Sequence, residues 1–179
     1  DDLLAKLAFE NKDDKLRLRG VWALHAIHGL TEDRRTEGLA DKGEYVRAWT
    51  VQLTGENGHP NWFGTVMING HLDDSPVVRL YLASLAQRYP RPFVYNVISG
   101  RTGLATSRIE DAKDPNLPLM YWYATEAYVA QMSKEKWNSD DARRLLFPSS
   151  AIPLLQEFSV RRFASMDNPA ALEFLVKEL

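Results

Sequence analysis

The stretch DKGEYVRAWTVQL, residues 41–53, decides the fold of this chain. It begins with an Asp, reaches Val46 and Arg47 after four variable residues, and continues with apolar residues at helical spacing. The copies of this phrase lie 28 and then 32 residues apart, a period that is typical of stacked structural repeats. The phrase therefore predicts a repeat array. Its other two copies are Asp13…Leu18-Arg19 and Asp73…Val78-Arg79.

Each copy opens a stripe of apolar residues spaced three and four positions apart, which indicates one buried helix face. After Asp41 the stripe consists of Val46, Trp49 and Leu53. The sequence shows no strand-like alternation bounded by hairpin turns. We therefore predict an all-α fold of antiparallel helix pairs. Shorter apolar segments lie between these helices at residues 32–39, 61–72 and 90–98, and later helices are expected at 152–166 and 169–179.

A fourth unit begins near Asp114 and departs from the phrase. Lys113 stands where the Asp is expected, and Leu119 stands where the Arg is expected. The helix that follows is apolar on all sides, as is typical of a helix buried by several neighbours. If the chain has a binding site of its own, we expect it here.

The charged residues of the phrase suit a structural role. An Asp before a helix accepts hydrogen bonds from its free N–H groups, and an Arg six residues later lies about one and a half turns into that helix. Such an Arg can reach the Asp of an adjacent unit, and its planar fork can bond a carboxylate through two N–H groups. We therefore predict a ladder of Asp–Arg pairs along the array. Its members are Asp13, Arg19, Asp41, Arg47, Asp73 and Arg79.

The phrase resembles the HEAT repeat, whose second helix carries an Asp-x4-Val-Arg pattern. The resemblance implies an α-solenoid, an armadillo-like α-α superhelix of HEAT-like antiparallel helix pairs. On that basis we expect residues 1–179 to form one repeat array of about five helix pairs, with a loop insertion near 99–108.

Longer phrases are similar to the helical-repeat region of large exported proteins from planctomycetes, verrucomicrobia and some bacteroidetes, of the membrane-bound dehydrogenase or PVC-type haem-binding family. The resemblance implies a periplasmic or exported location, with a sugar-dehydrogenase-like propeller before the repeats and a Cys-x-x-Cys-His cytochrome c domain after them. No residue here matches the motifs of either module, so the resemblance implies only the spacer between them. The phrases are LRLRGVWALH (16–25), VRAWTVQL (46–53), SPVVRLYLAS (75–84) and DPNLPLM (114–120).

Composition excludes several classes of site. The formal net charge is −2, from 22 basic and 24 acidic residues, so we expect no nucleic-acid partner. The absence of cysteine excludes disulfides, cysteine zinc sites, iron–sulfur clusters and covalently attached haem. No apolar run is long enough for a membrane span, so no membrane insertion is expected. The first residues contain neither a starting Met nor a signal pattern, which we interpret as a segment of a larger protein.

The sequence contains no catalytic constellation, and we predict no catalytic residue, metal or cofactor. His25 and His28 lie one turn apart, but no third ligand stands at a suitable spacing, and His25 fits better as a satisfied core histidine. Trp22, Trp49 and Trp122 fall on helix stripes and are expected in the core. Trp62 and Trp137 are alternative anchors for a partner.

Glu126 is the acid that needs an explanation, because it lies in the most apolar helix of the chain. It either pairs with Arg161 or Arg162 of a later helix, or faces a ligand in a pocket lined by Trp122 and Tyr123. We therefore take these five residues as the possible binding surface.

Two functions follow from these patterns. The first is a non-enzymatic scaffold that docks a protein partner or a neighbouring domain of the same polypeptide. The alternative is a HEAT-like nucleic-acid-binding enzyme of the DNA glycosylase type, which requires a basic groove with aromatics and an acid.

Overall fold

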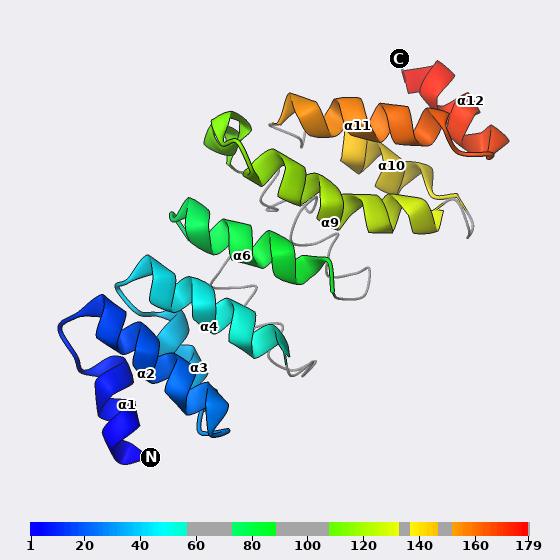
Figure 1. The fold of residues 1–179 in the computed structure, drawn as a ribbon. Helices are drawn as coiled ribbons and strands as arrows, with labels where there is room; N and C mark the ends of the chain where they lie inside the picture. Colours follow the sequence, from blue (N-terminus) through cyan, green and yellow to red (C-terminus); the bar gives the residue numbers. More distant parts are fainter. Residues whose placement is uncertain (57–72, 89–107, 133–136, 147–151, 179) are drawn as a thin grey trace. The chain divides into compact units, whose positions relative to one another are not determined.

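The computed structural model describes residues 1–56, 73–88, 108–132, 137–146 and 152–178 (Figure 1). Within these ranges all regular secondary structure is helical, with nine α-helices and one short 3₁₀-helix, so the predicted all-α class is confirmed. The chain divides into two compact units, residues 1–85 and 86–179. None of the helices in the described ranges has the length and apolar character that a membrane span requires.

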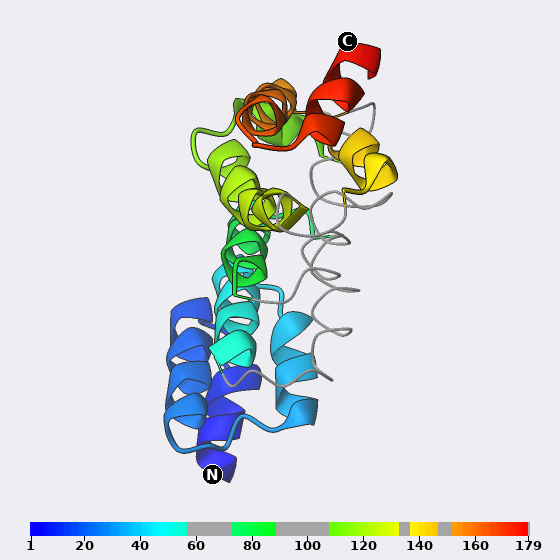
Figure 2. The ribbon, with the colours of Figure 1, turned by 90° about the vertical axis from the view of Figure 1, so that its right-hand side faces the viewer.

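The first unit contains the N-terminal helices. Helices α2, α4 and α6 lie side by side, and α1 and α3 pack against α2 and α4 (Figures 1 and 2). The segment 32–39 is α3, as expected from the sequence. The helices are α1 (Asp2–Phe9), α2 (Asp14–Ala26), α3 (Glu32–Leu39), α4 (Glu44–Glu56) and α6 (Pro76–Ala86), the last reaching one residue past the boundary of the unit.

The core of the first unit lies between α1, α2 and α4. Its fully buried members include Val21, Leu24 and Val46, and Val21 and Val46 belong to the apolar stripes of the sequence. Helix α1 approaches α2 at Gly20, where a Cβ atom would lie 2.6 Å from the Cα of Ala8. Glycine is therefore required at this position because the two backbones nearly touch.

Four helices, two or more of which carry the sequence phrase, are preceded by the same turn. A side-chain oxygen accepts a hydrogen bond from the backbone N–H two residues further on, and the helix begins three residues after that side chain. Such turns satisfy N–H groups that have no partner within the helix. The side chains are Asn11 before α2, Asp41 before α4, Asp73 before α6 and Asp114 before α9 (Leu117–Met132), with distances of 2.9, 2.6, 2.9 and 2.8 Å.

This turn corrects two registers that were predicted from the sequence. In the first unit the turn residue is Asn11, so the Arg six positions later is Arg17 and not Arg19. In the fourth repeat the turn residue is Asp114 and not Lys113, so the acid is retained and Met120 stands in place of the Arg. The first error arose because Asp13 and Arg19 offer a second match to the phrase, two residues further along the chain.

The second unit contains α9, α10, α11 and α12, and a 3₁₀-helix, η2, precedes α9. Helix α11 packs against α9, α10 and α12. Trp137 lies against the rings of Phe163 and Phe174, with centroids 5.3 and 5.7 Å away. Trp137 is therefore partly buried against the core, and its role as a partner anchor stays a prediction. The bounds are η2 (Ile109–Lys113), α9 (Leu117–Met132), α10 (Ser139–Leu146), α11 (Pro153–Ala164) and α12 (Pro169–Glu178).

Several sequence predictions lie outside the described residues. They are the apolar segments at 61–72 and 90–98, Trp62, and the loop insertion at 99–108 apart from Arg108, which precedes η2.

His28 ends α2 in a strained conformation, with a φ of 58° that favours glycine. The N–H of Gly29 closes the helix end by bonding the carbonyl of Leu24 at 2.7 Å. We expect His28→Gly to raise the free energy of unfolding by about 0.5–1 kcal/mol, because glycine adopts this φ without a steric penalty. Urea unfolding measures the change. His28→Ala removes the imidazole without relieving the strain, so an equal gain in that variant would contradict the explanation.

Candidate functional site

Two Arg–Asp pairs join the turns of successive repeats in the first unit. Arg17 donates through Nε and Nη2 to the two carboxylate oxygens of Asp41, at 2.8 and 2.9 Å. Arg47 makes the same two bonds to Asp73, at 2.7 and 2.9 Å. This is the two-pronged geometry that a guanidinium and a carboxylate favour.

The remaining guanidinium nitrogen, Nη1, donates to backbone carbonyls of the turn that precedes the same helix. Nη1 of Arg17 donates to the carbonyls of Asn11 and Lys12, at 2.9 and 3.2 Å. The corresponding atom of Arg47 bonds the carbonyls of Asp41 and Lys42, and that of Arg79 bonds those of Asp73 and Asp74. Each of these arginines thus acts on the loop that precedes its own helix.

Asp13 and Arg19 do not occupy the positions in the Asp–Arg ladder that the sequence predicted for them. Asp13 is the exposed N-cap of α2 and accepts a bond from the N–H of Lys15 at 2.9 Å. Arg19 is exposed, whereas the side chain of Arg17 is 2% exposed and is the one that binds Asp41. The correction follows from the turn at Asn11, which places Arg17 six residues later.

The pairs are electrostatically strong. The hydrogen bonds to Asp41 raise the pKa of Arg17 above its ordinary value, although burial opposes the shift. For Asp73, burial raises the pKa, but the hydrogen bonds from Arg47 and from the N–H of Ser75 outweigh it and leave the pKa below its usual range. Both shifts favour the charged forms of Arg17 and Asp73.

The lowered pKa of Asp73 predicts an acid-dependent stability. A carboxylate whose pKa is depressed by folding contributes stability above its unfolded value of about 3.9, and the contribution is lost as the pH falls through the folded value. We expect Asp73→Asn to cost about 1 kcal/mol at pH 6 and to flatten the loss of stability below about pH 4. Urea unfolding between pH 3 and pH 6 measures this. Asp33→Asn, at an exposed position of α3, is the control, and an unchanged acid slope in Asp73→Asn would contradict the prediction.

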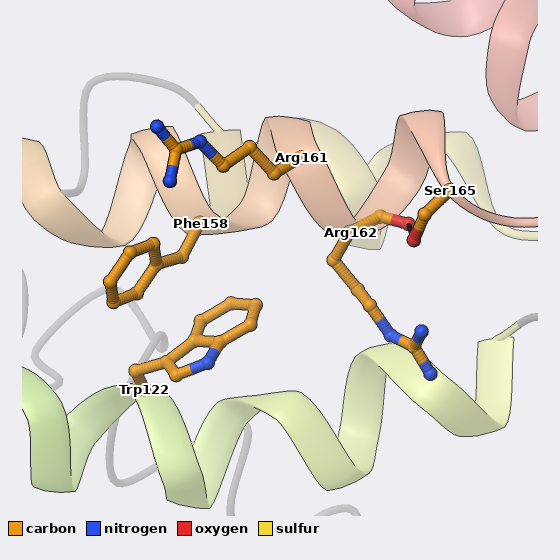
Figure 3. Close-up of a pocket in the computed structure, with 5 residues that line it drawn as sticks. All are labelled: Trp122, Phe158, Arg161, Arg162 and Ser165. Atoms are coloured by element: carbon orange, nitrogen blue, oxygen red, sulfur yellow. Dashed lines mark hydrogen bonds between the residues drawn. The ribbon is translucent and has the colours of Figure 1, made fainter.

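A pocket lies in the second unit, between α9 and α11 (Figure 3). It has a volume of about 340 Å³. Three of the five residues predicted as a binding surface line it, namely Trp122, Arg161 and Arg162, together with Phe158 and Ser165. We call this hollow the α9–α11 pocket.

The apolar side of the α9–α11 pocket is an aromatic pair. The rings of Trp122 and Phe158 meet edge to face, with centroids 5.3 Å apart and planes inclined by 60°. Sequence reasoning did not assign Phe158 or Ser165 to the site. Their spacing offered a signal, because on α11 they lie three or four residues from Arg161 and Arg162 and so share a helix face with one or both.

The two arginines of the α9–α11 pocket differ in their partners. Arg161 is 70% exposed and binds Glu157, one turn earlier on α11, at 2.6 Å. Arg162 has no ion pair with any carboxylate of the described residues, and its buried Nε has no hydrogen-bond acceptor there. A buried donor without an acceptor costs about 1–3 kcal/mol, so Arg162 carries a charge and a donor that the described residues of the unit do not use.

Glu126 and Tyr123 do not complete the site as predicted. Glu126 is half-buried on α9, and within the described part of the chain it makes no ion pair with Arg161 or Arg162. Tyr123 is 51% exposed and does not line the α9–α11 pocket. The reason is helical geometry, since Tyr123 lies 100° around α9 from Trp122.

A row of aromatic rings crosses the first unit. Trp22 meets Trp49 at a centroid distance of 5.1 Å, and Trp49 meets Tyr81 at 5.8 Å, so the row joins α2, α4 and α6. Trp22 is 39% exposed and not part of the buried core that was expected for it. Trp49 is partly buried against the core, as its position on the apolar stripe predicted.

The two histidines of the described ranges, His25 and His28, belong to no metal-binding group there. Nε2 of His25 lies 3.1 Å from a carboxylate oxygen of Glu56, and both side chains are partly exposed. Across the described ranges no group of three or more histidine, aspartate or glutamate side chains is arranged to hold a metal ion.

Comparisons of the chain with family models, with curated proteins and with solved structures found no significant match.

Proposed function

We propose that this chain is a non-enzymatic helical-repeat scaffold, an α-solenoid of HEAT-like helix pairs that docks a protein partner or a neighbouring domain. The observation that supports it is that the same Arg–Asp contact occurs twice, between α2 and α4 and between α4 and α6. Arg17 and Arg47 bind the Asp of the next repeat through the same two atoms and bond the carbonyls of their own turns through the third. Equivalent contacts between successive units are what a stack of repeats requires, because each unit contacts only its neighbours.

The array is further proposed to be part of a larger exported redox protein, in the periplasm, as a spacer between a propeller and a cytochrome domain. The support is the ordered set of phrases at residues 16–25, 46–53, 75–84 and 114–120 that resembles that family. The experiment begins with the complete reading frame of the gene. A propeller upstream and a Cys-x-x-Cys-His motif downstream are expected.

The docking function is tested by calorimetric titration of residues 1–179 with each flanking domain, produced separately. A saturable heat change with at least one of them is expected. Small-angle scattering of the chain alone tests the solenoid, because an extended array has a larger radius of gyration than the roughly 16 Å of a compact protein of this length. A compact radius would contradict the solenoid, and no binding by any flanking domain would contradict the docking.

The α9–α11 pocket supports a second candidate function, a nucleic-acid-binding enzyme. Such an enzyme needs basic and aromatic residues in a groove, and Trp122, Arg161 and Arg162 line this pocket. Phosphate contacts make binding strongly salt-dependent. A gel-shift assay with duplex DNA at 50 and 200 mM salt decides this point, and tight binding that weakens steeply with salt would favour the enzyme over the scaffold.

A further inference from the structure

We infer that the α9–α11 pocket binds an acidic peptide segment in which a bulky apolar side chain adjoins a carboxylate. The inference rests on the proposed scaffold function and gives the chemistry of the partner that docks here. The pocket lies within the second unit, so it does not depend on any contact with the first.

The carboxylate is assigned from Arg162. Its guanidinium has no ion pair among the described residues, and the buried Nε has no acceptor, so one positive charge lies at the α9–α11 pocket without a counter-ion. Arg161 contributes less, because it is held by Glu157. The hydroxyl of Ser165 donates to the carbonyl of Arg162 at 2.8 Å and is likewise occupied. The site thus offers one unpaired cation, which matches a single carboxylate.

The α9–α11 pocket contains a second donor. The indole N–H of Trp122 has no hydrogen-bond partner in the described part of the chain, and Figure 3 shows the indole and the guanidinium of Arg162 lining the same hollow. An indole N–H can only donate. The lining therefore offers an acidic ligand the indole N–H in addition to the guanidinium.

The apolar part of the ligand is assigned from the aromatic pair. Trp122 and Phe158 present ring edges and faces to a pocket of about 340 Å³, which is near the lower end of the roughly 300–1,000 Å³ of ligand sites. This space suits one large side chain and a neighbouring acid. Aromatic anchors of this kind carry much of the binding energy at protein interfaces.

The charges favour a peptide over a nucleic acid. A strand presents a row of phosphates and requires several free cations, whereas the pocket has Arg162 and an Arg161 that already faces Glu157. Glu157 is 51% exposed and would repel a phosphate near it. The net charge of −2 adds no general attraction for a polyanion.

The experiment is a titration of the ¹⁵N-labelled chain 1–179 with blocked tetrapeptides, followed by nuclear magnetic resonance. The reporter is the indole N–H signal of Trp122, one of five tryptophans, assigned by Trp122→Phe. The first peptide has phenylalanine before aspartate, and the matched peptides replace aspartate by asparagine or phenylalanine by alanine. We expect a saturable shift with the first peptide and binding at least about tenfold weaker with either of the others.

Two neighbouring arginines provide matched variants. Arg162→Gln is expected to weaken binding of the first peptide at least about tenfold, whereas Arg161→Gln is expected to change it less than about threefold, because only Arg162 is unpaired. Circular dichroism verifies that both variants are folded. Equal binding of the aspartate and asparagine peptides, no saturable shift with any peptide, or undiminished binding by a folded Arg162→Gln variant would overturn the inference. So would tighter binding of a single-stranded oligonucleotide at the same indole.

The two proposals fail in different ways. If a flanking domain binds Arg162→Gln as tightly as the unmodified chain, the scaffold stands and this pocket is not its docking site. If the peptide binds as expected but no flanking domain binds, the docking of those domains is wrong and the pocket inference stands.

Discussion

Replacing Arg17 by alanine is expected to lower the free energy of unfolding by about 3–5 kcal/mol. The loss is large because the partner stays behind: the side chain of Asp41 is 7% exposed and would keep a buried charge without a counter-ion. The carbonyls of Asn11 and Lys12 would lose their donor in the same step. Urea unfolding followed by circular dichroism measures the change.

Arg19→Ala is the matched control for this experiment. Arg19 lies two residues further along the same helix and is exposed, so its replacement should change stability by no more than about 0.5 kcal/mol. The comparison decides which register of the phrase is correct, because the phrase as it is spelled in the sequence assigns the ladder to Arg19. A larger loss in Arg19→Ala than in Arg17→Ala would refute the structural assignment.

Gly20→Ala is expected to lower the free energy of unfolding by about 2–3 kcal/mol. Added atoms in a packed contact cost about 1–3 kcal/mol, and the cost is at the upper end here because the obstacle at 2.6 Å is the backbone of Ala8. The better helix propensity of alanine returns only about 1 kcal/mol of this. Thermal and urea unfolding of the variant measure the net effect.

Two further variants separate a backbone clash from ordinary crowding. Gly55→Ala should cost less, since the nearest atom to its Cβ is a terminal methyl of Leu85, which can rotate away. The double variant Ala8→Gly with Gly20→Ala should not recover stability, because the Cα and N of residue 8 remain in place. Full recovery in the double variant would show that the Ala8 methyl group is the obstacle.

Local patterns predicted the helices well. The apolar stripe after Asp41 identified α4, and prolines at helix starts, such as Pro153 and Pro169, marked α11 and α12 to within a few residues. These signals lie within one helix, where spacing alone decides which residues share a face. Trp122, Arg161 and Arg162 were grouped because each was a possible neighbour of Glu126, and these three line the α9–α11 pocket.

Three-dimensional contacts decided the rest. The sequence offers both Arg17 and Arg19 to the ladder, and only the turn at Asn11 selects the first. The exposure of Trp22 depends on how α2 and α4 cross, and no spacing rule contains that angle. Three-dimensional packing also decides the pairing of Arg162. The sequence made Glu126 a reasonable partner, but the two side chains form no ion pair in the structure.

The three prongs of Arg17 have a consequence for cooperativity. The guanidinium of Arg17 binds the turn at residues 11–13 and also the carboxylate of Asp41 in the turn at residues 41–43. If either turn unfolds, the Arg17–Asp41 pair is broken and a buried charge loses its counter-ion. Arg47 links the second loop to a third in the same manner. In a chain of nearest-neighbour units, such shared bonds raise the interface energy relative to the intrinsic energy of each unit. Unfolding of one of these turns therefore weakens the next one. We expect α2, α4 and α6 of the first unit to unfold together.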